Sequence, residues 1–75
     1  MYKIVLNDNT CDDFTLTCEC DTLYDMIVNL ERIKKESTRL IREGTLTVID
    51  LEDGLILREY TIIDREIALT FEQGE

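Results

Sequence analysis

The stretch that decides the fold is residues 21–44, DTLYDMIVNLERIKKESTRLIREG. Its apolar residues recur at steps of three and four, which is the spacing of one face of an amphipathic helix. That apolar stripe consists of Leu23, Met26, Ile27, Leu30, Ile33, Leu40 and Ile41. Thr22 followed by Asp25 resembles a capping box, and Gly44 is a residue that commonly follows a helix end. These features predict one helix over residues 22–43.

Stretches on both sides of this helix alternate apolar and polar residues, which is the pattern of half-buried strands. Two precede the helix, at residues 2–7 and 14–20, and three follow it, at residues 45–51, 55–63 and 67–72. Turn residues such as Glu52-Asp53-Gly54 separate neighbouring strands. We therefore expect an α+β fold of order β-β-α-β-β-β, with a single helix packed on one face of a mostly antiparallel sheet.

The β-β-α-β-β portion of this order is similar to that of ubiquitin-like (β-grasp) folds. The resemblance covers most of the chain but includes no residue motif, and a shared fold does not imply a shared function. With 75 residues, the chain is near the lower size at which proteins fold alone. We expect residues 1–75 to form one acidic α+β domain.

Charge is the most informative global property. Seventeen Asp and Glu oppose eight Lys and Arg, which gives a net charge of −9. The predicted helix carries five basic and four acidic residues, so the excess negative charge belongs to the strands and turns. Such a surface repels nucleic acid and anionic membranes and attracts basic surfaces. We therefore expect a protein partner with a basic surface, and no direct binding to nucleic acid or membrane.

Several function classes are disfavoured by what the sequence lacks. Histidine is absent, the only serine is Ser37 within the predicted helix, and no glycine-rich phosphate loop is present. We therefore expect no enzymatic activity and no cofactor. The first residues do not resemble a signal peptide, and no apolar run approaches the roughly 20 residues of a membrane-spanning helix. These features favour the cytoplasm, of a bacterium or of an infected host cell.

The three cysteines, Cys11, Cys18 and Cys20, allow a weaker alternative, a cysteine-ligated metal module. Cys18 and Cys20 are two residues apart on a predicted strand, so their sulfurs share one face. Structural zinc takes four ligands, however, and the chain offers neither a fourth cysteine nor a histidine. We therefore predict no metal, and interpret Cys18 and Cys20 as small core residues that continue the stripe of Phe14 and Leu16.

Rows of carboxylates on neighbouring strands can imitate a nucleic-acid backbone. Strands lie about 4.8 Å apart, and duplex DNA carries one charge per roughly 1.7 Å of its axis. In size and charge the chain resembles small acidic phage and mobile-element proteins that inhibit nucleases, CRISPR nucleases among them. That resemblance implies an inhibitor that mimics nucleic acid and engages a nuclease or another nucleic-acid-binding protein. The residues expected to contact the partner are Asp12, Asp13, Glu19, Asp50, Glu52, Asp53 and Glu59.

The alternative function is a structural or assembly module that forms a homo-oligomer. Residues 55–63 place apolar side chains on both faces of their predicted strand, whereas one helix covers only one face of the sheet. An apolar second face needs a cover, which a homodimer would supply. The residues expected at that interface are Ile49, Leu51, Ile56, Tyr60 and Ile62.

Overall fold

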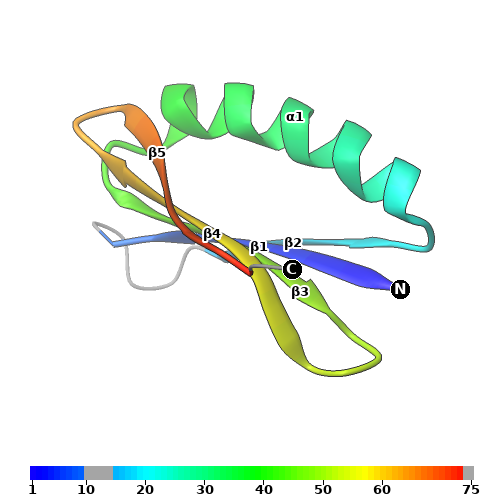
Figure 1. The fold of residues 1–75 in the computed structure, drawn as a ribbon. Coiled ribbons are helices and arrows are strands. Elements are labelled where there is room, and N and C mark those ends of the chain that lie inside the picture. The colour runs from blue at the N-terminus through cyan, green and yellow to red at the C-terminus, as the bar shows by residue number, and fades with distance from the viewer. Residues whose placement is uncertain (10–14, 74–75) are drawn as a thin grey trace.

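The computed structural model describes residues 1–9 and 15–73. Its elements are β1 (Tyr2–Asp8), β2 (Thr15–Cys20), α1 (Leu23–Leu40), β3 (Gly44–Asp50), β4 (Leu55–Ile63) and β5 (Glu66–Glu72). All neighbouring strands pair antiparallel in one sheet of order β2-β1-β3-β4-β5, and α1 lies across one face of this sheet (Figure 1). The predicted α+β class and element order are therefore confirmed.

Helix α1 begins where its cap predicts and ends earlier than expected. The Thr22 hydroxyl accepts a hydrogen bond from the Asp25 backbone N–H at 3.1 Å, which satisfies one free donor of the first turn. The helix stops at Leu40, because the backbone of Ile41 is extended and its side chain is buried in the core. The predicted end at residue 43 is therefore wrong. This helix is not long and apolar enough to cross a membrane, and it is the only one within residues 1–9 and 15–73.

The core lies between α1 and the centre of the sheet. From the helix come Met26, Leu30 and Ile33, together with Ser37, whose hydroxyl donates to the Lys34 carbonyl at 3.0 Å. The buried sheet residues on the helix side are Ile4, Leu6, Cys20, Leu46, Val48, Tyr60 and Ile62. The register explains most of this set, because Ile4 lies opposite Val48, and Leu46 lies between Leu6 and Tyr60.

A β-bulge in β4 corrects one expectation from the sequence. Val48 of β3 pairs with Arg58, but the next residue of β3 pairs with Ile56, so Leu57 is the extra residue. An extra residue changes the phase of the alternation, and Ile56 therefore faces away from Tyr60 and Ile62. Tyr60 is only 5% exposed and Ile62 only 1%, both beneath α1. The prediction that these three residues share one free apolar face is wrong.

Gly44 has a different role from the one its position after the helix indicates. It is the first residue of β3 and pairs with Asp8 of β1. A Cβ added at Gly44 would lie 2.1 Å from the backbone oxygen of Asn7. The glycine therefore allows the close approach of β1 and β3, rather than ending the helix through a left-handed backbone.

The β4–β5 turn fastens the C-terminal end of α1. Asp64 and Arg65 both have a positive φ, which is uncommon for residues other than glycine. Arg65 donates its backbone N–H to the Arg42 carbonyl at 3.0 Å and its guanidinium to the Arg39 carbonyl at 2.9 Å. Arg42 pairs with Asp64 at 3.1 Å. The bond to Arg39 supplies a donor to a helix-end carbonyl, and the other two contacts join the turn to the segment that follows α1.

Candidate protein-binding surface

The topology gathers carboxylates at one end of the sheet. Strands β2, β3 and β5 end there, β1 and β4 begin there, and α1 starts there because it directly follows β2 (Figure 1). We call this region the acidic end, and define it by Glu19, Asp21, Asp25, Asp50, Glu52 and Asp53. Five of these residues are exposed and Asp50 is half-buried. A strand, the start of a helix and a hairpin turn thus contribute to one surface.

Few cations balance the acidic end among the described residues. Lys3 lies directly opposite Glu19 across β1 and β2. The N-terminal ammonium is 3.9 Å from the Glu52 carboxylate, and both groups are largely exposed. Exposed pairs of this kind contribute little, about 0–1 kcal/mol. At the other end of the sheet, Arg42 and the turn residue Arg65 supply positive charge close to Asp64.

The carboxylates of the β3–β4 turn have different roles. The Asp50 side chain accepts a hydrogen bond from the Glu52 backbone N–H at 3.0 Å. Its carbonyl accepts another from the Gly54 N–H at 2.8 Å, and Gly54 has a positive φ of 70°. Asp50 therefore holds the turn in shape. Glu52 and Asp53 are exposed at the tip, where a partner can reach them.

The structure brings together part of the predicted partner-binding set. Glu19, Asp50, Glu52 and Asp53 all belong to the acidic end. Glu59 lies apart from them, half-buried in the middle of β4, on the face away from α1 and opposite Thr47. Asp12 and Asp13 lie outside the described residues.

The sequence interpretation missed two carboxylates of the acidic end, Asp21 and Asp25. Asp25 is used only in the capping box with Thr22, and Asp21 is left out of the predicted partner-binding set. The signal that could have found them is topological, because a helix that directly follows β2 must begin at the end of the sheet where β2 stops. Asp21 is two residues from Glu19, so the sequence could have grouped these two, but no local pattern around Asp25 indicates its placement.

The apolar residues expected at an oligomer interface are divided by the fold. Ile49 and Ile56 are direct neighbours across β3 and β4, on the face away from α1. Leu51 is exposed in the turn that follows β3. These three residues lie at the surface near the acidic end, whereas Tyr60 and Ile62 are in the core.

The cysteine pair lies on the helix side of β2. The sulfurs of Cys18 and Cys20 are 4.0 Å apart, and the Asn29 amide lies 3.7 Å from the Cys20 sulfur. Burial raises the pKa of the Cys20 thiol, and the neighbouring Cys18 raises it further. A thiol that keeps its proton is a poor metal ligand. No group of three or more potential ligand residues occurs within residues 1–9 and 15–73, and Cys11 lies outside that part.

The chemistry that the acidic end offers is recognition of cations. Exposed carboxylates accept charge-assisted hydrogen bonds from Lys and Arg, and they attract basic surfaces over distances of about a Debye length. Glu19, Asp50 and Asp25 belong to strands and the helix, whereas Asp21, Glu52 and Asp53 lie in the connecting segments.

Comparisons of this chain with known protein families, with curated proteins and with solved structures found no match.

Proposed function

We propose that this chain is a non-catalytic binding protein whose acidic end engages a basic surface of a nucleic-acid-binding protein and so inhibits it. The observation that carries the proposal is the acidic end itself, where six carboxylates meet at one end of the sheet. Elsewhere, ion pairs such as Arg42–Asp64 and Arg58–Glu72 offset part of the negative charge.

Physical spacing supports a surface that competes with nucleic acid. The strands that carry Glu19 and Asp50 flank β1, so they lie two strand spacings, about 10 Å, apart, which is close enough to present several carboxylates to one Lys/Arg-lined groove. The electrostatic attraction that draws a phosphate-binding groove to nucleic acid would also draw it to these carboxylates. The partner class we propose is therefore a nuclease or another protein with a phosphate-binding groove.

Competition for DNA is the experiment that tests this proposal. The immobilised chain is used to recover its partner from the native cell, and duplex DNA is then titrated against the complex. We expect DNA to displace the chain, and the chain to lower the partner's affinity for DNA. Simultaneous binding of DNA and the chain, with unchanged affinity for both, would contradict the proposal.

Charge variants define which surface is responsible. The test variant is Asp21→Lys/Glu52→Lys/Asp53→Lys, which leaves the structural carboxylate of Asp50 in place. The matched control is Glu36→Lys/Glu43→Lys/Glu66→Lys, which changes the net charge equally at exposed positions outside the acidic end. We expect the test variant to lose the competition with DNA and the control to keep most of it.

A second candidate function is favoured by a separate observation. Ile49 and Ile56 sit side by side on the sheet face that α1 does not cover, with Leu51 exposed beside them. An assembly module would bury these residues against a second copy. Under this candidate, sedimentation at micromolar concentration shows a dimer that Ile56→Asn dissociates. A monomer across that range would remove the candidate.

A further inference from the structure

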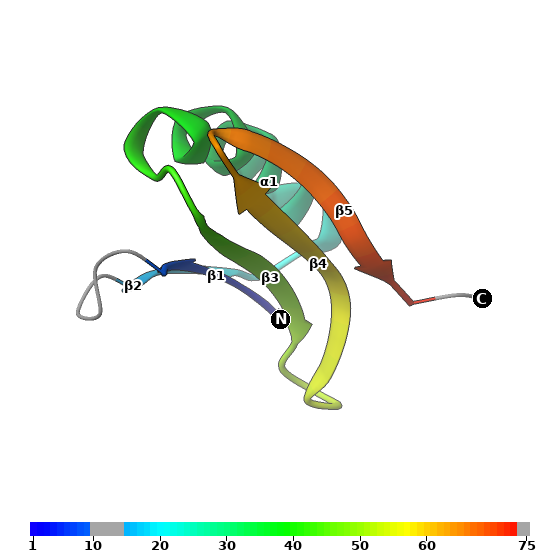
Figure 2. The ribbon, with the colours of Figure 1, turned by 90° about the vertical axis from the view of Figure 1, so that its left-hand side faces the viewer.

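Helix α1 leaves part of its own face of the sheet uncovered. Five strands at about 4.8 Å spacing make the sheet about 19 Å wide, whereas a helix is about 10 Å in diameter. The backbone of the helix lies close to β1 and β2, its Lys34 reaches Tyr60 of β4, and its C-terminal end lies beside the start of β5 (Figure 1). Figure 2 shows the β3–β4 hairpin bending away from α1. The helix side of β4 and β5 is therefore open near the acidic end.

One flank of α1 faces this uncovered region. The Lys34 ammonium lies 4.9 Å from the centre of the Tyr60 ring, so the Lys34 flank of the helix faces β4. Ile27 lies seven residues, or about two turns, before Lys34 and shares its flank. Leu23 is one turn further toward the helix start. Both residues belong to the stripe that the sequence assigns to the core, yet Leu23 is 54% exposed and Ile27 is 45% exposed.

The sheet contributes a matching apolar surface. Leu69 of β5 is the cross-strand neighbour of the buried Tyr60, so it points to the helix side, yet it is 51% exposed. The bulge residue Leu57 packs partly against the core, and Leu55 is exposed at the start of β4. We call this surface the helix-side shelf, and define it by Leu23, Ile27, Leu55, Leu57 and Leu69.

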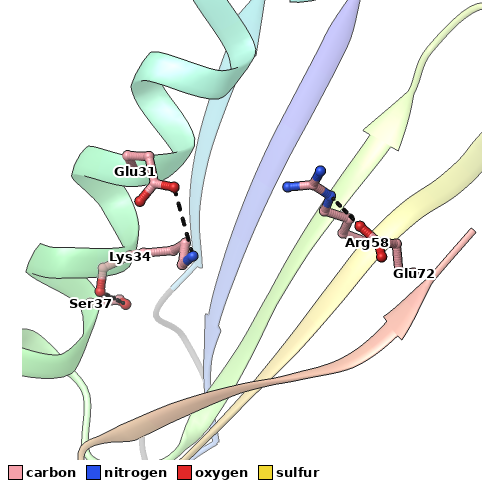
Figure 3. Close-up of polar contacts among 5 residues, drawn as sticks. All are labelled: Glu31, Lys34, Ser37, Arg58 and Glu72. Carbon is pink, nitrogen blue, oxygen red and sulfur yellow. Dashed lines mark hydrogen bonds and ion pairs between the residues drawn. The ribbon is translucent and has the colours of Figure 1, made fainter.

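The uncompensated charges beside the helix-side shelf are negative and would attract a cationic partner. Its two cations already have partners: Lys34 lies 3.9 Å from Glu31, and Arg58 lies 3.2 Å from Glu72. Figure 3 shows the first pair on the helix and the second on β4 and β5. The carboxylates of the 50–53 turn, at the end of the shelf where β4 begins, have fewer cations beside them. The uncompensated charge next to the shelf is therefore negative.

We propose that the helix-side shelf binds one amphipathic, basic helix of the partner protein, laid beside α1. The width left on the sheet fits a helix at the usual interaxial distance of about 8–10 Å. The apolar stripe of that helix would pack on the shelf, and its Lys and Arg residues would lie toward the 50–53 turn. This inference rests on the proposed function and adds the structure of the partner segment. A second copy fits less well, because the chain carries a net charge of −9 and its helix already packs on its own sheet.

A synthetic peptide pair serves as the probe. One peptide has 18 residues of Leu and Lys with leucines at helical spacing, and the other has the same composition in an order without an apolar stripe. Fluorescence anisotropy measures the binding of each to the folded chain. We expect the amphipathic peptide to bind at least about tenfold more tightly, because it alone can bury an apolar stripe on the shelf.

Two matched pairs of variants locate the binding. Leu69→Asn is compared with Phe71→Asn, because Phe71 is 48% exposed on the same strand but belongs to the other face. Ile27→Gln is compared with Val28→Gln, whose side chain is 50% exposed on the outward flank of the helix. We expect Leu69→Asn and Ile27→Gln to weaken binding of the amphipathic peptide about tenfold, and the two controls to change it less than about twofold.

Each other outcome overturns the proposal. These outcomes are no binding of the amphipathic peptide, equal binding of both peptides, and equal loss in the control variants. A dimer of the chain that Leu69→Asn dissociates would assign the shelf to a second copy instead. Where the acidic-end variant weakens both peptides and the shelf variants change nothing, the acidic-end proposal stands and the shelf proposal fails.

Discussion

Substitution of Gly44 by alanine tests how closely β1 and β3 approach. The added Cβ would lie 2.1 Å from the Asn7 backbone oxygen, whereas real Cβ atoms essentially never come closer than 3.0 Å to such a neighbour. The two strands would therefore have to separate by about 0.9 Å. The same Cβ would lie 3.1 Å from the Ile41 side chain, which is fixed in the core.

The cost follows from the bonds that this separation stretches. The Asn9 N–H donates to the Glu43 carbonyl at 3.0 Å beside the contact, and this bond would lengthen beyond hydrogen-bonding range. Each lost hydrogen bond costs about 1 kcal/mol, and displacement of the well-packed neighbouring core adds more. We expect Gly44→Ala to lower the free energy of unfolding by about 3 kcal/mol or more.

Gly54→Ala, in the turn between β3 and β4, is the matched control. Nothing lies within 4 Å of a Cβ added there, and the cost comes only from its φ of +70°. We expect a loss of about 1 kcal/mol. Urea unfolding followed by circular dichroism measures both variants. A Gly44→Ala protein that is as stable as Gly54→Ala would refute the close-approach argument.

Three further substitutions or treatments test other parts of the structure. Stability should fall as the pH rises above about 9, because folded Cys20 keeps a proton that the unfolded chain releases. Cys20→Ala should reduce this fall in urea midpoints measured at about pH 7 and about pH 10; an unchanged pH dependence would contradict the buried thiol. A chelator should leave the thermal midpoint unchanged, and a stoichiometric metal whose removal unfolds the protein would contradict a metal-free fold. Arg65→Ala should cost about 1 kcal/mol, since the bond to the Arg39 carbonyl is lost; calorimetry showing no loss would contradict its role at the helix end.

Local patterns predicted the elements well because they act over a few residues. The helix start follows from Thr22, whose hydroxyl caps the first turn. The strands follow from alternation between apolar and polar residues. The helix end was missed because Ile41 leaves the helix to enter the core, which is a tertiary effect.

Features that depend on strand pairing could not be predicted from the sequence. The bulge at Leu57 places Tyr60 and Ile62 under the helix and Ile56 on the other face. No residue pattern near Leu57 predicts this bulge. The placement of α1 over β1 and β2 leaves Leu23 and Ile27 exposed despite their helical periodicity. In the candidate site, the acidic residues of the 50–53 turn are close in sequence, so the sequence alone predicts that they cluster. The addition of Asp25 required the topology.

The association rate of the partner tests the central claim most directly, which is that the acidic end binds a basic surface. The rate is measured for Asp21→Lys/Glu52→Lys/Asp53→Lys and for Glu36→Lys/Glu43→Lys/Glu66→Lys, at about 0.1 M and about 1 M salt. The account predicts association at least about tenfold slower for the acidic-end variant at low salt, with the difference largely lost at high salt. Equal rates for the two variants, independent of salt, would contradict it.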